Sequence, residues 1–359
     1  MCSLSHTRIY VNGHEAVLCV DLFIKSVTII TMHKRLPKMR GTVTASAPSQ
    51  AFLMGEHAVL YGSPALALSV DRRSFSTAKE LDRGHLRIRS HLLGVYEEKD
   101  GSVLVSNPEL ERVARGVKGV LERYDVRSGV ELEIRSEVPI GSGMASSASV
   151  AAAISKSLDG LFELEMSEEE LLESVYLFER IIHGKASKTG PACAVMGGII
   201  WVEWTGDVMT ASSLGFKDVP LVMACTGKPS PTKEMIERVS TLGSMLPGVR
   251  DSVVRAISEL VVRGREAIMA EDYELLGTLM NVDQGLLYSL GVSSWEIERI
   301  VWKAREGGSY GAKLSGAGGG GCVVILHPRP SSLVGELEPV AEMVFTAKVA
   351  REGARIEPG

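Results

Sequence analysis

The sequence predicts an α+β fold in two domains, and three observations lead to that prediction. Strand-like alternation and helical spacing of apolar residues both recur along the chain, without the strict strand–helix alternation of a parallel α/β sheet. A run rich in glycine and serine, residues 139–147, separates a predicted strand from an alanine-rich helix. A second glycine-rich run, residues 316–321, leads into an apolar strand.

The composition is that of a globular protein with room for two domains. The chain has 359 residues, of which 45% are hydrophobic and 23% are charged. Its formal net charge of −5 argues against a general nucleic-acid-binding protein, which usually carries a basic face. A local basic patch could still hold a small anionic ligand.

The five cysteines favour an intracellular protein with free thiols. They are scattered, odd in number and form no CxxC or Cys/His cluster, which favours a reducing compartment and no structural zinc. A cytoplasmic location is therefore expected. Cys193 lies near the predicted site, where a role as a small buried hydrophobic residue is favoured.

Residues 1–38 are predicted to be an extension ahead of the first domain. The stretch 16–32 is fairly apolar, but Asp21 and Lys25 interrupt it. It is too charged and too short for a membrane span and lacks the clean cleavage site of a signal peptide. Coherent patterning begins near Met39, so the first domain is predicted over 39–205 and the second over 206–359.

The expected elements follow in order from residue 41. Strands are expected where β-branched or apolar residues alternate, and helices where apolar residues recur every three or four positions. In the first domain the strands are expected at 41–47, 51–54, within 79–100, and at 130–134 and 197–204, with helices at 107–124, 148–158 and 167–183. In the second domain the strands are expected at 221–225 and 322–326, with helices near 232–241, 249–269, 273–285 and 294–306.

The first glycine-rich run has the features of a phosphate-binding loop. Glycines allow the backbone to approach an anion with converging N–H groups, and the N-terminus of the following helix adds unpaired donors. Ser146 and Ser147 add hydroxyls that can reach a phosphate oxygen or Mg²⁺. The run is neither a Walker A motif nor GxGxxG, and a purely structural turn is the alternative.

The second glycine-rich run strengthens this interpretation. Five glycines among the six residues 316–321 would weaken a strand start unless a close backbone approach were needed there. A flexible linker is the alternative, which the apolar segments on both sides disfavour.

Three segments together resemble the GHMP small-molecule kinases, and among them the mevalonate kinases. The first, 47–62, reads APSQAFLMGEHAVLYG and contains the GEHAVxYG pattern typical of mevalonate kinases. The second is the Gly/Ser run, and the third, 313–322, is similar to the family's KLTGAGGGGC. The resemblance covers about residues 40–350. It implies the GHMP kinase fold, with an N-terminal domain like ribosomal protein S5, a ferredoxin-like C-terminal domain and the active site between them.

The resemblance also implies an activity and a set of site residues. It implies transfer of the γ-phosphate of ATP to the C5 hydroxyl of mevalonate, in isoprenoid synthesis, with Mg²⁺ as cofactor. The residues implied for ATP are Ser136, Gly141, Ser142, Gly143, Met144, Ala145, Ser146 and Ser147. Those implied for the substrate are Glu56, His57, Gly318 and Gly319, and those for the metal are Ser147 and Glu179.

Two of these residues, Glu179 and His57, each allow an alternative role. Glu179 lies in an otherwise apolar helical stretch, where an unpaired carboxylate would be costly and a metal ion would compensate. An ion pair with a neighbouring base is the alternative. For His57, a structural histidine with satisfied hydrogen bonds is as reasonable as substrate contact.

The chain departs from the family pattern at two catalytic positions. The position usually held by lysine in APGK or APSK is Gln50, and the position of the usual catalytic aspartate is Gly190. Phosphoryl transfer depends mainly on positioning and electrostatics, and general-base help contributes about 10²–10⁴-fold, so activity can survive both losses. Gln50, Lys185 and Lys188 are the candidate catalytic residues, with solvated lysines as the alternative for the last two.

Three functions are therefore compared. The first is a mevalonate-kinase-like enzyme, and the second is a kinase for a phosphorylated mevalonate such as mevalonate 3-phosphate. The third is a catalytically impaired regulatory protein that binds ATP or a metabolite. The expected partners are ATP and a small anionic substrate, without nucleic acid or membrane, and a homodimer is left open.

Overall fold

The computed structural model describes residues 5–11, 14–21, 26–30, 41–184 and 186–358. It divides the chain into two units, Met1–Gly41 and Thr42–Gly359. The first unit contains an antiparallel sheet in the order β1-β2-β3, formed by β1 (Ser5–Val11), β2 (His14–Asp21) and β3 (Ser26–Ile30). The predicted extension over residues 1–38 falls within this unit.

The second unit begins with a large mixed sheet that forms its first lobe. The sheet runs in the order β11-β10-β5-β9-β6-β7-β8, with β4 paired to β5 and β16 paired to β4. Its strands are β4 (Val43–Met54), β5 (Ala65–Leu81), β6 (His85–Ser90), β7 (Gly94–Lys99), β8 (Ser102–Val105), β9 (Gly129–Ser136), β10 (Ile199–Thr205), β11 (Val208–Ser213) and β16 (Arg355–Ile356). The predicted domain boundary near residue 206 falls in the turn between β10 and β11, which pair with each other.

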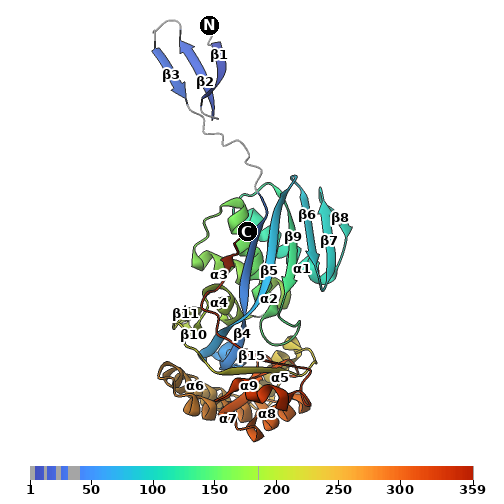
Figure 1. Ribbon diagram of the computed structural model, residues 1–359, viewed down its shortest axis with the longest axis vertical. Helices are drawn as coiled ribbons and strands as arrows, with labels where there is room; N and C mark the ends of the chain where they lie inside the picture. The colour runs from blue at the N-terminus through green and yellow to red at the C-terminus, as the bar shows by residue number, and fades with distance from the viewer. Residues whose placement is uncertain (1–4, 12–13, 22–25, 31–40, 185, 359) are drawn as a thin grey trace. The chain divides into compact units, whose positions relative to one another are not determined.

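Helices cover this sheet and bury its apolar face. Helix α2 packs on β4 and β5, and α3 and α1 pack behind it, as Figure 1 shows. The helices are α1 (Pro108–Arg123), α2 (Ser146–Phe162), α3 (Glu168–His183) and α4 (Thr189–Met196), with a short 3₁₀ turn η1 (Ala58–Tyr61) after β4. The alanine-rich sequence of α2 leaves it largely buried, because small side chains let a helix approach the sheet closely.

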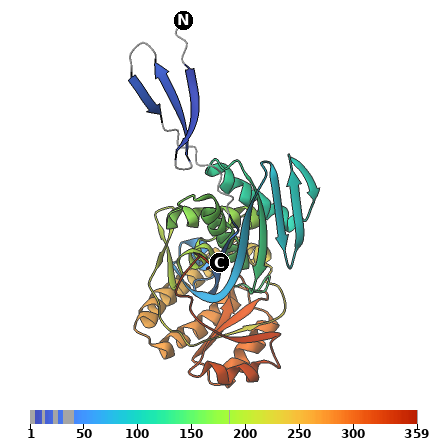
Figure 2. The same ribbon diagram turned by 45° about the horizontal axis from the view of Figure 1, so that its top comes forward.

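The second lobe is a four-stranded antiparallel sheet with five helices among the described residues. Its order is β13-β14-β12-β15, and Figure 2 shows its helices, coloured yellow to red, beside these strands. The elements are β12 (Leu221–Cys225), α5 (Thr232–Met245), α6 (Pro247–Met269), α7 (Tyr273–Ser289), α8 (Trp295–Glu306), β13 (Gly311–Ser315), β14 (Cys322–Leu326), α9 (Pro330–Leu337) and β15 (Met343–Ala347). The predicted α+β class is confirmed.

One hydrophobic core joins the two lobes. Leu53 and Leu66 of the first sheet belong to the same buried cluster as Val222 and Val324 of the second sheet. The lobes are therefore packed together along the ends of β4 and β5, where the phosphate-binding loop also lies.

Local sequence signals account for several helix ends. The side chain of Asn107 accepts the N–H groups of Glu109 and Leu110 at the start of α1. Ser167 and Glu170 form a capping box at the start of α3, close to the expected helix start. Helix α4 was missed, because its sequence, TGPACAVM, carries glycine and proline and no amphipathic spacing.

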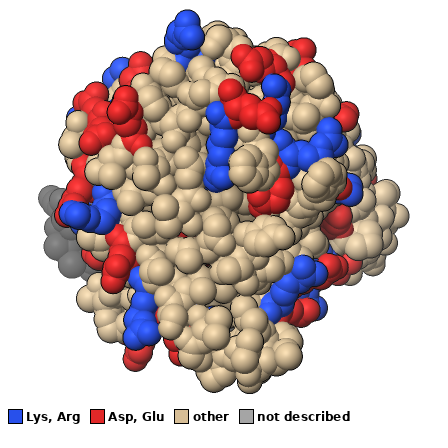
Figure 3. Space-filling model, turned by 90° about the horizontal axis from the view of Figure 1, so that it is seen from below, with Lys and Arg blue, Asp and Glu red and all other residues tan. Residues whose placement is uncertain are grey.

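The surface agrees with the mixed charge of the sequence. Figure 3 shows one face of the molecule with blue and red side chains interspersed around a largely uncharged centre. No helix in the described part of the chain is both long and apolar enough to cross a membrane.

Candidate active site

The phosphate-binding loop connects β9 to α2 and has an alternating backbone. Gly141, Gly143 and Ala145 have positive φ angles of 69°, 75° and 51°, separated by two residues outside that region. Such alternation turns successive N–H groups toward one point, which suits an anion. Within the described residues, no side chain caps the N-terminus of α2, so its first N–H groups are free for a ligand.

The two glycine-rich runs meet backbone to backbone. A Cβ atom at Gly143 would lie 2.3 Å from the carbonyl oxygen of Ser315, and one at Gly316 would lie 2.7 Å from that of Gly143. Only glycine tolerates this approach, as the sequence predicted for the second run. The contact brings the start of the second glycine run, from the second lobe, against the phosphate-binding loop of the first.

A cavity of about 360 Å³ lies over the loop and has the properties of a nucleotide site. Its apolar wall combines side chains from several elements of the first lobe, among them Leu92, Leu93, Leu110, Ile134 and Ile140. Its polar end is formed by Ser136, Gly141, Ser142, Gly143, Ala145, Ser146 and Ser147. Met144 is fully buried and does not line this cavity, but its carbonyl accepts the N–H of Gln50 at 3.0 Å.

A second, smaller cavity of about 170 Å³ lies beside the first. Its polar lining comes mainly from Gln50, Glu56, His57, Glu179 and Ser187. Five residues line both cavities: Gly143, Ala145, Ser147, His183 and Thr232. The two cavities therefore share a wall.

Ser147 and His183 lie at the shared wall, and Glu179 lines the smaller cavity. Ser147 is in the first turn of α2, and Glu179 and His183 are one turn apart on α3. Ser147 Oγ lies 3.2 Å from His183 Nε2. Glu179 is 8% exposed, and its Oε1 is buried without a hydrogen-bond partner among the described residues. Burial raises the pKa of the Glu179 carboxyl, while His183 and Ser147 oppose the rise.

This arrangement fits a magnesium ion held partly by a nucleotide. A buried carboxylate oxygen without a partner is costly, and a cation would satisfy it. Mg²⁺ commonly takes one or two protein ligands and completes its shell with water and phosphate oxygens. In the described part of the chain no cluster of three His, Cys, Asp or Glu side chains offers a complete protein site. For the ion-pair alternative, His183 is the base beside Glu179 among the described residues.

Glu56 belongs to a buried group of charged side chains. Lys313 Nζ, from β13, donates a short hydrogen bond to Glu56 Oε1 and a second bond of 2.7 Å to the carbonyl of Leu314. Asp283, from α7, lies on the other side of Lys313 with an Nζ–Oδ2 distance of 3.6 Å. Burial raises the pKa of Glu56, and it raises that of Asp283 to about 7, while Lys313 opposes both shifts.

His57 is held by the second glycine run. Its Nε2 lies 2.8 Å from the carbonyl oxygen of Ala317, to which the N–H donates. Burial lowers the pKa of His57, and the nearby Lys313 lowers it further. His57 therefore lines the smaller cavity as a neutral imidazole, with Nε2 hydrogen-bonded to Ala317. A structural role and contact with a substrate are compatible in this position.

Gln50 and Gly190 are neighbours in the lining of the smaller cavity. Gln50 is 7% exposed, and its Oε1 has no hydrogen-bond partner among the described residues. A Cβ atom at Gly190, in α4, would lie 3.7 Å from that oxygen and 3.0 Å from the Cβ of Ala145. The two departures from the family pattern are thus neighbours, and the free amide oxygen of Gln50 lies close to where a side chain at position 190 would begin.

Three predicted residues of the described part of the chain, Lys188, Gly318 and Gly319, are not brought to the cavities in the way expected. Lys188 Nζ pairs with Glu173 at 2.6 Å and lies over the ring of Tyr176, so its contacts do not support a catalytic role. Gly318 and Gly319 line neither cavity, and Gly316 and Ala317 of the same run line the smaller one instead. Lys185 lies outside the described residues.

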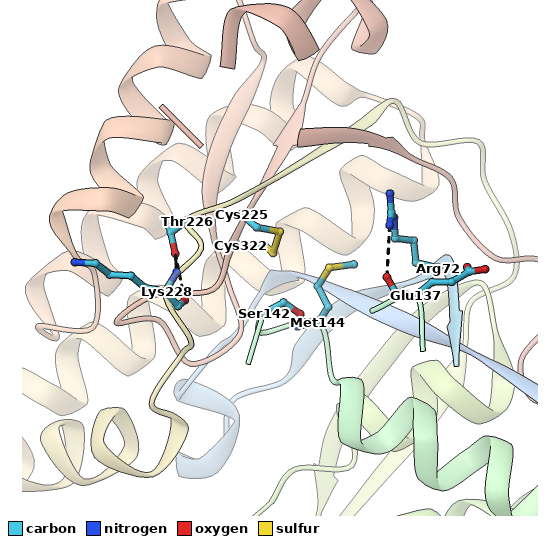
Figure 4. The surroundings of a disulfide bond; sticks show 8 residues. All are labelled: Arg72, Glu137, Ser142, Met144, Cys225, Thr226, Lys228 and Cys322. Carbon is cyan, nitrogen blue, oxygen red and sulfur yellow. Dashed lines mark hydrogen bonds between the residues drawn. A yellow bond between two sulfur atoms is a disulfide. The ribbon is translucent and has the colours of Figure 1, made fainter. Parts of the chain in front are cut away.

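A disulfide corrects the expectation of free thiols. Figure 4 shows Cys225 and Cys322 bonded where they face each other on β12 and β14, 97 residues apart in sequence. The N–H of Cys322 donates to the carbonyl of Ser142 at 2.8 Å, next to the phosphate-binding loop. Cys193 is buried and free as predicted, and burial raises its pKa to about 12.

Three polar residues at or behind the cavities escaped the sequence prediction. His183 could have been found, because it follows Glu179 by four positions and so shares its helix face. Lys313 begins the motif at 313–322, but its apolar neighbours indicated a strand and gave no sign of a buried charged group. The sequence around Asp283 does not indicate a site, because its charged neighbours Lys313 and Glu56 are distant in sequence and lie on other elements.

Comparisons with known protein families agree with this architecture. The family model for the GHMP kinases N terminal domain matches residues 111–198, and the model for the GHMP kinases C terminal matches residues 265–341. A mevalonate kinase from Thermococcus sibiricus is 34% identical over 333 residues, covering 88% of this chain and 98% of that protein. One from Aeropyrum pernix is 34% identical over 326 residues, covering 89% and 99%.

Solved structures show the same fold. The L. major mevalonate kinase in complex with R-mevalonate matches with a TM-score of 0.77 at 24% identity, covering 88% of this chain and 98% of that one. The Lactococcus lactis galactokinase complexed with galactose matches with a TM-score of 0.74 at 20% identity, covering 88% and 95%. The fold, the two domain matches and the archaeal relatives together place this chain in the GHMP kinase family of small-molecule kinases.

Proposed function

We propose that the protein transfers the terminal phosphate of ATP to a hydroxyl of mevalonate. The observation that carries the proposal is the shared wall of the two cavities at Gly143, Ala145, Ser147, His183 and Thr232. A nucleotide in the larger cavity and a small acceptor in the smaller one would present their reacting groups to the same wall. The relatives of about 33% identity named mevalonate kinase support mevalonate as the acceptor.

The nucleotide side would be bound mainly by backbone groups. The converging N–H groups of the phosphate-binding loop and the N-terminus of α2 would hold the phosphates, and the apolar wall at Leu92, Leu110 and Ile134 would hold the base. Ser147 and Glu179 would hold Mg²⁺. That ion would supply charge neutralisation on the phosphates, which is the main electrostatic need of phosphoryl transfer.

The acceptor side would be bound by polar side chains of the smaller cavity. Glu56 and Gln50 each keep an oxygen without a protein partner in the described residues, and a hydroxyl of the acceptor can donate to either. The neutral ring of His57 completes this wall. Binding here would orient the acceptor hydroxyl toward the γ-phosphorus, so that its oxygen forms the new P–O bond while the bond to ADP breaks.

The proton of the acceptor hydroxyl has no carboxylate base at position 190. Because the transition state is loose, proton removal can occur late, and positioning supplies most of the rate. The loss of a base at this position predicts a slower enzyme than one with the usual aspartate, by up to about 10²–10⁴-fold.

A phosphorylated mevalonate, such as mevalonate 3-phosphate, is the second candidate acceptor. The observation that favours it is the pair Gln50 and Gly190, where a lysine and an aspartate are usual in the family pattern. An acceptor that already carries a phosphate would need another arrangement of charge around its hydroxyl than mevalonate does. The chain differs from the family pattern in charge at these two positions.

An assay with a panel of acceptors tests these proposals. Purified protein with ATP and Mg²⁺ is incubated with mevalonate, mevalonate 3-phosphate or mevalonate 5-phosphate, and ADP release is measured. ADP release with mevalonate supports the first acceptor, and release only with a phosphorylated one supports the second. No release with any of them, despite measurable ATP binding, would overturn the enzymatic proposal in favour of a regulatory protein.

A homodimer and the two-domain boundary at residue 206 stay predictions.

A further inference from the structure

Three charged side chains from three elements meet in the interior of the protein. Glu56 follows β4, Lys313 is in the middle of β13, and Asp283 is in α7. The side chains of Lys313 and Asp283 are 0% exposed and that of Glu56 is 1% exposed. Glu56 lines the smaller cavity, while Lys313 and Asp283 line neither cavity.

Such a group is a poor device for stability alone. Removing several charges from water costs more than their attraction returns in many proteins, and apolar side chains of similar size often stabilise as well or better. Two carboxylates share one lysine here, and Glu56 Oε2, Asp283 Oδ1 and Asp283 Oδ2 have no hydrogen-bond partner in the described residues. The arrangement therefore calls for a role beyond holding the lobes together.

The surroundings of Lys313 fix the position of its ammonium group. Its Nζ donates to the carbonyl of Leu314 at 2.7 Å as well as to Glu56. The N–H of Leu314 donates in turn to Gln284 Oε1 at 2.8 Å, which ties β13 to α7. The ammonium is thus anchored to the second lobe and reaches across to a carboxylate of the first.

We propose that Lys313 is a positioning residue for Glu56: it binds one carboxylate oxygen and leaves the other available to the acceptor in the smaller cavity. This inference rests on the proposed function, since it assigns the smaller cavity to the acceptor. The bond from Lys313 opposes the effect of burial on the Glu56 carboxyl and holds it in one orientation, so that its other oxygen can accept a hydrogen bond from a hydroxyl of the acceptor. The nucleotide cavity is lined by neither residue.

The inference predicts a selective effect of Lys313→Met. The variant should raise KM for the acceptor by about tenfold or more, because the Glu56 carboxylate loses the ammonium that orients it toward the acceptor. KM for ATP should change by less than about twofold, because the nucleotide is bound by other groups. A lysine that only held the lobes together would change KM for the acceptor and KM for ATP alike, or would lower the melting temperature and leave both unchanged. Either result overturns the inference.

A double-mutant cycle tests whether Lys313 acts through Glu56. Glu56→Gln, Lys313→Met and the double variant are compared by KM for the acceptor, with melting temperatures as a check on folding. The double variant should be no worse than the worse single variant. If the two effects multiply, the residues act independently and the inference fails. Lys303→Met, an exchange of the same type at an α8 lysine that pairs with Glu306, is the control and should match the wild type.

The design remains decisive if Lys313→Met does not fold. The double variant removes one buried positive and one buried negative charge, so it keeps the charge balance that the single variant loses. Its KM for the acceptor should equal that of Glu56→Gln, and a further increase overturns the inference. Failure of the proposed function is a separate result, because it is read from the wild type in the acceptor panel before any variant is made.

Discussion

The hydroxyl oxygen of Ser147 lies 3.2 Å from Nε2 of His183, at the wall shared by the two cavities. Glu179 is one helical turn away on the same face of α3, and its Oε1 has no hydrogen-bond partner in the part of the chain that the structure describes. A serine hydroxyl that donates its proton to an imidazole keeps its lone pairs free for a cation. This geometry makes the shared wall the place where the metal assignment can be tested.

Ser147→Ala and Glu179→Gln should each lower kcat by more than about tenfold, the low end of what a positioned electrostatic group contributes. Each variant should also need a higher Mg²⁺ concentration for nucleotide binding, measured by calorimetry. Glu173→Gln is the matched control on α3, because Glu173 is half-exposed and pairs with Lys188 away from the cavities. Near-normal rates in both test variants would remove the metal assignment.

Restoring the usual side chains at positions 50 and 190 should reveal what their loss costs. Gly190→Asp alone places a carboxylate in a buried position with Ala145 and the Gln50 oxygen as close neighbours, so the melting temperature should fall. Adding Gln50→Lys supplies a counter-charge and should recover part of that loss. The double variant should exceed the wild-type kcat with mevalonate by about tenfold or more, if general-base help reaches its usual range.

The outcome of that experiment also bears on the acceptor. A double variant that is stable but no faster than the wild type on mevalonate would contradict the prediction. It would indicate that Gln50 and Gly190 suit another acceptor, and the same variants would then be compared on mevalonate 3-phosphate.

The sequence predicted the site best where local chemistry decides the structure. The approach of Gly143 to Ser315 and Gly316 follows from glycine content, because no other residue fits there. The start of α2 at Ser146 follows from a strand, a glycine-rich turn and an alanine-rich helix in succession. These signals lie within a few residues of one another, so they can be read without knowing the tertiary structure.

Contacts between distant segments could not be predicted in the same way. Glu56 and Lys313 are 257 residues apart and meet only because β4 and β13 pack together. Cys225 and Cys322 form a disulfide because β12 and β14 pair in one register, which no spacing of cysteines reveals. The ammonium of Lys188, a candidate catalytic residue, pairs with Glu173 of α3, which the sequence also did not indicate.

Asp283→Asn should stabilise the protein, and more so at pH 8 than at pH 5. Burial raises the pKa of Asp283 from 3.8 to about 7 in the folded state. Between these values the folded protein retains a proton that the unfolded chain has lost, so the free energy of unfolding falls as the pH rises through this window. Asparagine keeps the size of the side chain and does not titrate, so the variant avoids this loss.

The measurement is the difference in unfolding free energy between Asp283→Asn and the wild type, from denaturant titrations at several pH values. Using the difference removes the contributions of distant groups that titrate equally in both proteins, whereas Glu56 interacts with Asp283 and is part of the measured effect. Asp272→Asn would not serve as a control because it caps α7, so Asp207→Asn, an exposed aspartate between β10 and β11, is used. A difference that is constant with pH would show that Asp283 is ionised in both states.

Reduction of the Cys225–Cys322 disulfide should lower the stability of the protein. The bond closes a chain segment of 97 residues, and a disulfide typically contributes about 2–4 kcal/mol to the free energy of unfolding by limiting the freedom of the unfolded chain. Melting temperatures measured with and without a small dithiol should therefore differ by several degrees. Cys225→Ser is the control: it should melt near the temperature of the reduced wild type and should not respond to the dithiol, because any remaining response would come from another cysteine. If alkylation and mass spectrometry showed Cys225 and Cys322 as free thiols without added reductant, or if full reduction left the melting temperature unchanged, the bond would not contribute to the fold.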